Sequence, residues 1–255
     1  MDKTASKLHQ YTLGVVAHLL LLLAWYLSVH VGDVPKYILP SPVDTFRALG
    51  VADYGWWAAT LVTGAEIFGG YALALAVGVV LALLFTWSKS FESLMLPLLV
   101  TLNMIPKVAI GPLIIVWFSY GVLTNTMMAF SIAVFPILLT TARGLREIEP
   151  DLLDLVRSLR GSRWQLFTKI QLPGALPYVF AGMKVAAILA VAGAIVGEFL
   201  GSDKGLGYLM LQVQVTLDTP AMFMAVILIT LLGVLLYGLV LGLERWLVPK
   251  DARVS

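Results

Sequence analysis

The stretch RGLREIEPDLLDLVRSLRGSRWQLFTKIQLP, residues 143–173, is a long polar segment lodged between apolar ones. It carries six of the seventeen Lys and Arg residues of the chain. A loop this long and this basic lies in water, and its charge favours the cytoplasmic side of a membrane. Apolar residues recur in it at helical spacing: Leu152, Leu155, Val156, Leu159 and Leu166. This pattern predicts an amphipathic segment that offers an apolar stripe to a soluble partner.

The overall composition identifies the class of protein. Of 255 residues, 60% are hydrophobic and 13% are charged, which is typical of a polytopic membrane protein and excludes an ordinary soluble domain. The absence of cysteine excludes disulfides and thiolate metal sites. The basic residues flank apolar segments, so we expect no nucleic-acid partner.

Six apolar segments are each long enough to cross a bilayer core, which needs about 20 residues. They cover 11–31, 58–86, 92–118, 124–142, 177–200 and 221–246. The predicted fold class is therefore an all-α polytopic membrane protein with six transmembrane helices. We expect the first segment to be retained as a span, because it lacks the cleavage site of a signal peptide.

Prolines predict two local features of this fold. Pro106, inside the third span, predicts a kink or an unwound turn. Between the first two spans, Pro40, Pro42 and Asp44 predict a turn followed by a short helix, 42–50, along the outer interface.

The distribution of charge predicts the orientation. If the N-terminus is cytoplasmic, twelve of the seventeen Lys and Arg residues lie on that side and three lie outside. The remaining two, Lys107 and Lys184, fall inside spans. This asymmetry is a strong positive-inside signal and places both termini in the cytoplasm. An even number of spans requires the same result.

The sequence offers little catalytic chemistry. It contains no GxxxxGK[ST] phosphate loop, and the glycine-rich segment 201–207, GSDKGLG, follows a membrane helix instead of a strand. His9, His18 and His30 lie in or near the first span without metal-ligand spacing, so no metal site is predicted. We therefore expect a chain that is not itself an enzyme.

The polar segment should contain a helix over about residues 150–160. Pro150 suits a first helical position, and Asp151 suits the positive end of the helix dipole. Such an amphipathic helix fits a groove of another protein. An apolar stripe between arginines also suits a helix that lies on lipid headgroups, and periodicity alone leaves both alternatives open.

This segment resembles the EAA motif of permease subunits of bacterial ATP-binding-cassette importers, written EAA-x3-G-x9-I-x-LP. Here the pattern reads Asp154-Leu155-Val156-x3-Arg160-x9-Ile170-x-Leu172-Pro173. The resemblance extends over IPKVAIGPLIIVWFSYG at 105–121 and from LPGALPYVF into GLGYLM, so that it covers about three quarters of the chain. The branch it resembles most is that of nitrate, sulfonate and taurine importers, including relatives assigned to pyrimidine-type vitamin precursors.

The resemblance implies a type I importer permease of the bacterial cytoplasmic membrane with both termini inside. Its expected parts are an N-terminal helix with an external loop, 1–55, a permease core, 56–246, and a cytoplasmic tail, 247–255. The implied partners are a second copy of the chain, two ATPase subunits, an external solute-binding protein and membrane lipid. No cofactor is expected in this chain, since ATP and Mg would bind the ATPase.

The resemblance also implies which residues couple to the ATPase: Asp154, Leu155, Val156, Leu159, Arg160, Gly161 and Ser162. Arg160 stands where the motif has glycine, so the turn that needs positive φ is expected to move onto Gly161. Ser162 and Gln165 predict a capping box that starts a second short helix.

Four ionisable residues fall inside spans, where such residues usually face the bundle interior or a watery path. They are Glu66, Lys107, Lys184 and Glu198. We take Lys107, Glu198, Glu66 and the nearby Asn103 as candidates for a translocation pathway. In the empty state Glu198 would pair with Lys107. The alternative is structural pairing or snorkelling to the interface, which we expect of Lys184.

The predicted function is solute permeation energised by separate ATPases. The alternative is a self-contained secondary transporter or a polytopic membrane enzyme. A secondary transporter often has broken helices in both halves, whereas only one break is evident here. A small anion is the first substrate suggested, by the branch and by Lys107, and a pyrimidine-type vitamin precursor is the second.

Overall fold

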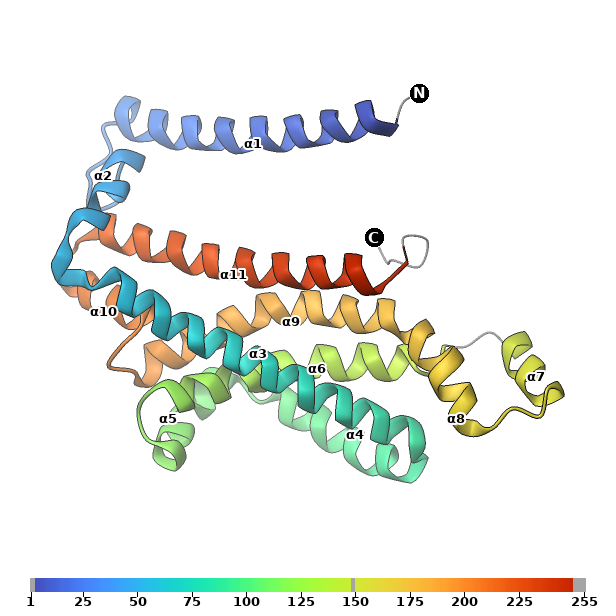
Figure 1. Ribbon diagram of the computed structural model, residues 1–255. Helices are drawn as coiled ribbons and strands as arrows, with labels where there is room; N and C mark the ends of the chain where they lie inside the picture. Colours follow the sequence, from blue (N-terminus) through green and yellow to red (C-terminus); the bar gives the residue numbers. More distant parts are fainter. Residues whose placement is uncertain (1–2, 148–149, 250–255) are drawn as a thin grey trace. The chain divides into compact units, whose positions relative to one another are not determined.

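The computed structural model describes residues 3–147 and 150–249, and within these ranges every regular element is a helix (Figure 1). Five helices of this described part are long and apolar enough to cross a membrane, and a bent pair of helices gives a sixth when it is counted as one broken span. The prediction of an all-α polytopic membrane protein is thereby confirmed, with five to six apolar spans.

The long helices match the predicted spans closely. They are α1 (Lys3–Val31), α3 (Trp56–Trp87), α6 (Val122–Gly144), α9 (Leu172–Gly201) and α11 (Thr219–Leu247). The predicted third span is divided into α4 (Lys89–Met104) and α5 (Lys107–Phe118). A further helix, α10 (Leu206–Val215), follows the glycine-rich segment and was not predicted.

The third span breaks where proline predicts it. Helix α4 ends at Met104, Ile105 is extended, and α5 begins after Pro106 with a bend of 100° between the two helices (Figure 1). Pro106 has no N–H to donate to the preceding turn, so the hydrogen-bond ladder stops there. The predicted kink is confirmed and is sharper than a simple bend.

The chain forms two compact units. The first contains the chain up to Trp56 together with Leu209–Leu228, and the second contains Trp57–Tyr208 together with the chain from Ile229. The division expected from the sequence, with boundaries at 55–56 and 246–247, stays a prediction.

In the second unit, α9 returns alongside α6 and packs closely against it. The contact is made by small residues, because Ala129, Ala133, Ala186, Ala190 and Ala194 are buried. A Cβ on Gly193 would lie 2.6 Å from the Cα atom of Ala129, so the two backbones are in direct contact there. Small residues at a helix interface permit this approach and the van der Waals packing that holds helices together in lipid.

The core extends outward from that contact, and a second cluster lies beside it. Ile67 and Tyr71 of α3 and Leu236 and Val240 of α11 complete the core around α6 and α9. Towards the other end of α6, a second cluster joins α3 to α4 and contains Ala82, Phe85, Leu138, Ala142, Leu145 and Ala175, with Phe91, Met95, Leu96 and Leu99 packed against it. Helix α4 is thus attached through its first turns, near Phe91.

In the first unit, α1 is tied to its neighbours by tryptophan and threonine side chains. The Trp25 indole N–H donates to the carbonyl of Pro40 at 2.9 Å, and its ring lies 5.7 Å from that of Phe223. Thr219 donates to the carbonyl of Tyr37 at 2.8 Å. The Tyr54 hydroxyl donates to the carboxylate of Asp218, and this bond raises the pKa of Tyr54 to about 12.

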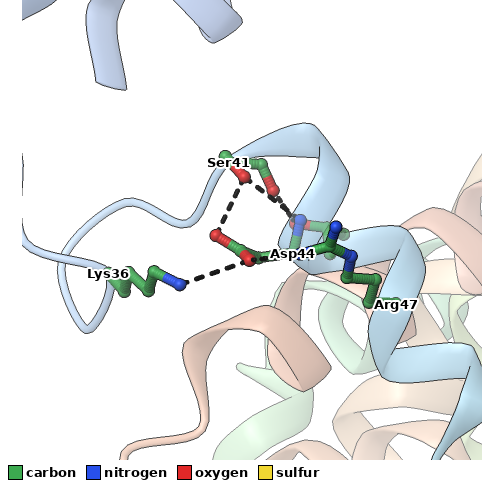
Figure 2. A network of polar contacts seen from close by, with 5 residues as sticks. Lys36, Ser41, Asp44 and Arg47 are labelled. Atoms are coloured by element: carbon green, nitrogen blue, oxygen red, sulfur yellow. Dashed lines mark hydrogen bonds and ion pairs between the residues drawn. The ribbon is translucent and has the colours of Figure 1, made fainter. Parts of the chain in front are cut away.

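The predicted short helix is present as α2 (Pro42–Arg47), continued by a 3-10 turn, η1 (Ala48–Gly50). Ser41 caps it by accepting from the N–H of Asp44 at 3.1 Å. Figure 2 shows Ser41, Lys36 and Arg47 around the carboxylate of Asp44. The Ser41 hydroxyl and the two cations hold the pKa of Asp44 below its usual value.

We predict that Gly193→Ala destabilises the bundle, because its methyl group would meet the backbone of α6. The matched control is Gly174→Ala in the same helix, where nothing lies within 4 Å of the new Cβ. Overpacking should lower the free energy of unfolding of Gly193→Ala by about 1–3 kcal/mol, whereas the control should be neutral or slightly stabilised by helix propensity. Unfolding in mixed detergent measures both, and equal stabilities would contradict the packing described for α6 and α9.

Candidate functional site

The polar segment folds as two short helices that lie beyond the ends of α6 and α9 in Figure 1. The first, α7 (Pro150–Ser158), begins at Pro150 with Asp151 in its first turn, as predicted. Asp154 is exposed, Val156 is half-buried, and the side chain of Leu155 lies outside the described residues. Leu159, just past the helix end, is 73% exposed. This short helix therefore presents both a carboxylate and apolar side chains at its surface.

The end of α7 corrects one expectation. Arg160 itself takes the left-handed conformation, with φ 53°, and the turn does not move onto Gly161. The N–H of Gly161 donates to the carbonyl of Val156 at 2.8 Å, which is the bond of a Schellman helix end. The position that the motif gives to glycine thus keeps its backbone conformation, although an arginine there costs about 1–2 kcal/mol.

Gly161 is required for a different reason. A Cβ at this position would lie 2.6 Å from Cγ1 of Val156. The glycine permits the chain to fold back tightly over the last turn of α7. The turn therefore depends on two consecutive residues. Arg160 adopts the positive φ, and Gly161 leaves space for the side chain of Val156.

The second short helix, α8 (Arg163–Leu166), starts with the predicted capping box. Ser162 accepts from the N–H of Gln165 at 3.2 Å, and the Gln165 side chain accepts from the N–H of Ser162 at 2.8 Å. A π-helical turn, η3 (Phe167–Gln171), then leads directly into α9. No sequence pattern predicted this turn.

Aromatic contacts connect α8 and η3 to the end of α3, and a polar contact connects η3 to the end of α6. The Phe167 ring lies 5.9 Å from that of Trp87 and 5.8 Å from that of Trp164. The Gln171 side chain donates to the carbonyl of Leu145 at 3.4 Å. A cleft of about 580 Å³ lies here, lined by Thr86, Trp87, Arg163, Trp164, Leu166, Phe167 and Gln171.

An ion pair joins the end of α6 to the start of α4. Arg146 donates two hydrogen bonds to Glu92, at 2.5 and 2.6 Å, and a third to the carbonyl of Phe85 at 2.9 Å. Such a two-pronged contact between guanidinium and carboxylate fixes orientation as well as distance. Neither residue stands out in the sequence, because they lie 54 positions apart and each resembles an ordinary loop charge.

A second ion pair nearby is local. Arg143 bonds Glu147 one helical turn later at 3.0 Å, and this contact lowers the pKa of Glu147. Arg143, Arg146, Glu92 and Glu147 border a cleft of about 420 Å³. The end of the bundle predicted to face the cytoplasm is therefore a network of charges around the root of the polar segment.

The pathway candidates divide into two groups. Asn103 is exposed and Lys107 half-buried at the break between α4 and α5, where the Lys107 ammonium donates to the carbonyl of Leu102 at 3.1 Å. Glu66 and Glu198 are 0% and 1% exposed, deep between helices of the second unit. Within the part of the chain that the structure describes, Lys107 and Glu198 bond to other groups, so the expected ion pair between them is not formed.

Glu66 and Glu198 instead belong to a buried polar cluster. Glu198 accepts from the Thr63 hydroxyl at 2.5 Å and from the N–H groups of Gly207 and Tyr208. Glu66 accepts from the Asn125 side chain at 2.8 Å. These contacts show that both residues have structural partners, and a role of either residue in a translocation pathway stays a prediction. Thr63, Asn125 and the two N–H donors were missed because the cluster joins segments up to 143 residues apart.

The expectation for Lys184 was wrong. Its ammonium does not snorkel to an interface but pairs with Glu244 at 3.1 Å, and the two side chains are 18% and 5% exposed. An ion pair inside the bundle offsets the cost of burying both charges. Nothing in the local sequence around Lys184 points to a carboxylate 60 residues later. Among the described residues, no group of three or more His, Asp and Glu side chains has the arrangement of a metal site.

Comparisons with known proteins give a consistent result. Residues 74–249 match the family model of the binding-protein-dependent transport system inner membrane component. A probable ABC transporter permease protein of Haemophilus influenzae is 36% identical over 85% of this chain and 89% of its own length. The formylaminopyrimidine transport permease protein of Halalkalibacterium halodurans is 32% identical over 91% of this chain and 92% of its own.

One more relative and one solved structure extend the comparison. The riboflavin transport system permease protein of Chloroflexus aurantiacus is 36% identical over 93% of this chain and 89% of its own. Among solved structures, the inward-facing MetNI methionine ABC transporter is similar in fold, with a TM-score of 0.56 and 21% identity over 76% of this chain and 94% of the other.

We predict that Arg146 and Glu92 are energetically coupled across the α4–α6 junction. A double-mutant cycle with Arg146→Gln and Glu92→Gln should give a coupling energy of about 1 kcal/mol, since the contact is bidentate and partly buried. Thermal unfolding of the purified protein provides the four stabilities. The control cycle, Arg143→Gln with Glu147→Gln, removes an exposed pair one turn apart and should give a smaller coupling. Additive effects at Arg146 and Glu92 would show that their contact is incidental.

Proposed function

The chain belongs to the family of binding-protein-dependent transport system inner membrane components, and from this membership we propose how it couples a partner's ATP hydrolysis to solute movement. It is a permease subunit of an ATP-binding-cassette importer and a multi-pass protein of the inner membrane. Its six apolar spans would form half of the translocation pathway. ATP and Mg would bind the partner ATPase, since the sequence has no phosphate loop.

The observation that carries the proposal is the form of α7. It is a nine-residue helix with exposed apolar residues, ended by a fixed turn and followed by a capped second helix. A helix held firmly at its C-terminal end suits insertion into a groove of another protein. We assign this groove to the ATPase subunit. Asp154, Leu155, Val156 and Leu159 would make the contact, and Arg160, Gly161 and Ser162 would hold the helix in place.

Two routes would carry motion of α7 into the membrane. One passes through α8 and the π-helical turn into α9, which is continuous with them. The other passes through the end of α6, where Arg146 forms an ion pair with Glu92 at the start of α4. Because α4 leads to the break at Pro106, this second route ends beside Lys107. The Arg146–Glu92 contact is thus a candidate joint between the ATPase and the pathway.

The assembly proposed is a homodimer of this chain with two ATPase subunits and one external solute-binding protein. A single copy has one coupling segment and one set of six spans. A second copy would complete the pathway and engage the second ATPase.

We predict that Leu159→Asp abolishes binding of the ATPase without unfolding the spans, because a charge would be buried unpaired in an apolar groove. Native mass measurement of the detergent-purified complex should show two permeases with two ATPases for the wild type and a permease dimer alone for the variant. Ser158→Asp adds the same charge on a neighbouring face of α7 and should retain the ATPases. Retention by Leu159→Asp would favour a helix lying on lipid headgroups.

The pathway is proposed to pass the break between α4 and α5. Irregular backbone at membrane depth is tolerated where it lines a protein-enclosed or watery cavity. Lys107 stands at this break, and its half-buried ammonium has one recorded protein acceptor, the carbonyl of Leu102. An ammonium has three N–H donors, so it has further capacity to bind an anion. A small organic or inorganic anion is therefore the first candidate for the solute.

A second candidate is a heteroaromatic vitamin or vitamin precursor. Two relatives that share more than 30% of their residues with this chain are named for formylaminopyrimidine and for riboflavin. The exposed apolar side chains at the break, Met104 and Ile105, suit a flat ring better than a small anion. Selection between the two would be made largely by the binding protein.

We predict that Lys107→Ala lowers uptake of an anionic solute roughly tenfold, since a hydrogen bond to a charged group contributes about 1.5–3 kcal/mol. Lys107→Arg should be milder because it keeps the charge. The measurement is uptake of radiolabelled methanesulfonate, which is an anion, and of formylaminopyrimidine into proteoliposomes, normalised to assembled complex.

The control for this prediction is Lys89→Ala, which removes an exposed lysine at the other end of α4. Normal anion uptake by Lys107→Ala would make the lysine structural. Uptake of formylaminopyrimidine alone, unaffected by the substitution, would select the second candidate.

A further inference from the structure

Glu66 and Glu198 form a pair of carboxyl groups inside the bundle that the transport proposal does not use. Glu66 lies in α3 and Glu198 near the end of α9, and both are almost completely buried. Both belong to one cluster, because Thr63, one turn from Glu66 on α3, donates to Glu198 at 2.5 Å, and Asn125, which donates to Glu66, packs against Gly197 beside Glu198. Two ionised carboxylates have only acceptor oxygens, so neither could donate a hydrogen bond to the other. One proton on the pair would supply that donor.

The donors around the pair show which residue carries the proton. Glu198 accepts from the Thr63 hydroxyl at 2.5 Å, from the N–H of Tyr208 at 3.3 Å and from the N–H of Gly207. It is therefore well solvated as an anion. Oε1 of Glu66 accepts from Asn125, but Oε2 receives no hydrogen bond from the described residues.

No compensating cation is present within this described part of the bundle. The recorded hydrogen bonds of the two carboxyls are with Thr63, Asn125 and backbone N–H groups. The ammonium of Lys184, in the same helix as Glu198, pairs with Glu244 instead. Burying two adjacent anions without a partner costs several kcal/mol per charge in proteins, whereas one shared proton removes one of the charges.

We propose that Glu66 is a resident proton-binding site: its carboxyl carries a proton on Oε2 and donates it in a hydrogen bond to the Glu198 carboxylate. The proton stays bound, no bond to carbon changes, and the pair holds a single negative charge. That charge faces the first turn of α10, whose N–H groups and helix dipole favour an anion.

The surrounding backbone is shaped to this carboxylate. Gly205 has φ 102°, and a Cβ there or on Gly207 would collide with the Glu198 carboxyl. Thr63, which donates to Glu198, also accepts from the N–H of Leu206 at 2.8 Å. The glycine-rich segment therefore wraps the carboxylate closely, and the proton on Glu66 completes its set of donors. The charged residues of the segment itself, Asp203 and Lys204, are exposed, so neither lies beside the buried carboxylates.

The proposal gives the two glutamates opposite responses to the same substitution. In Glu66→Gln the amide N–H₂ replaces the O–H donor, and the amide oxygen still accepts from Asn125. The melting temperature should therefore stay within about 2 °C of wild type. In Glu198→Gln an N–H₂ group would face the N–H donors of α10, and the melting temperature should fall by roughly 6–12 °C, corresponding to a lost buried charged partner.

Infrared spectroscopy of the purified full chain tests the proton directly. The carbonyl stretch of a protonated carboxyl should be present in the wild type at neutral pH and absent in Glu66→Gln. Glu244→Gln is the matched control, because it removes a buried carboxylate that is paired with Lys184, and the band should persist. This measurement remains available if Glu198→Gln fails to fold.

Three results would overturn the proposal. The first is a wild-type spectrum without a protonated carboxyl. The second is a band that survives Glu66→Gln, which would place the proton elsewhere. The third is a melting temperature that rises when sodium chloride replaces choline chloride in the wild type but not in Glu66→Gln, which would make the resident ligand a metal cation held by Glu66.

Discussion

The close contact between the backbones of α6 and α9 is the feature on which the rest of this bundle depends. In lipid there is little hydrophobic drive for helices to associate, so they must gain by packing and by polar contacts. Alanine and glycine along both helices permit that packing. The same close approach brings Asn125 near Glu66 and Glu198, and places the ends of α6 and α9 side by side to support the polar segment.

Hydropathy and proline predicted most of the fold, because both act locally. A span is recognisable from some twenty consecutive residues, and Pro106 removes a backbone donor whatever surrounds it. The capping box of Ser162 and Gln165 was predictable for the same reason, since its two partners are three residues apart. The beginning of α7 at Pro150 and the short helix α2 after Ser41 belong to the same class of local signals.

The features that escaped prediction are those that join distant segments or depend on the backbone alone. The partner of Lys184 lies 60 residues away, and that of Arg146 lies 54 residues before it. Helix α10 is short, and the glycine-rich segment before it carries no local signal that predicts a helix. Arg160 was misjudged because glycine is the usual residue for positive φ, whereas the turn here is imposed by the bond from Gly161 to Val156. Side-chain identity was the wrong guide at that position.

The π-helical turn at Phe167–Gln171 sets the rotation of the short helices α7 and α8 about the axis of α9. A π turn holds one residue more than an α turn, and one residue corresponds to roughly 100° of rotation about a helix axis. An uninterrupted α-helix would therefore place the preceding short helices at a different angle around the axis of α9. Removal of a single residue here would leave every hydrophobic segment intact and turn the exposed apolar side chains around α7 in another direction. The number of residues between α7 and α9 thus sets the direction in which α7 points. An insertion or deletion in this segment should therefore be more damaging than most substitutions.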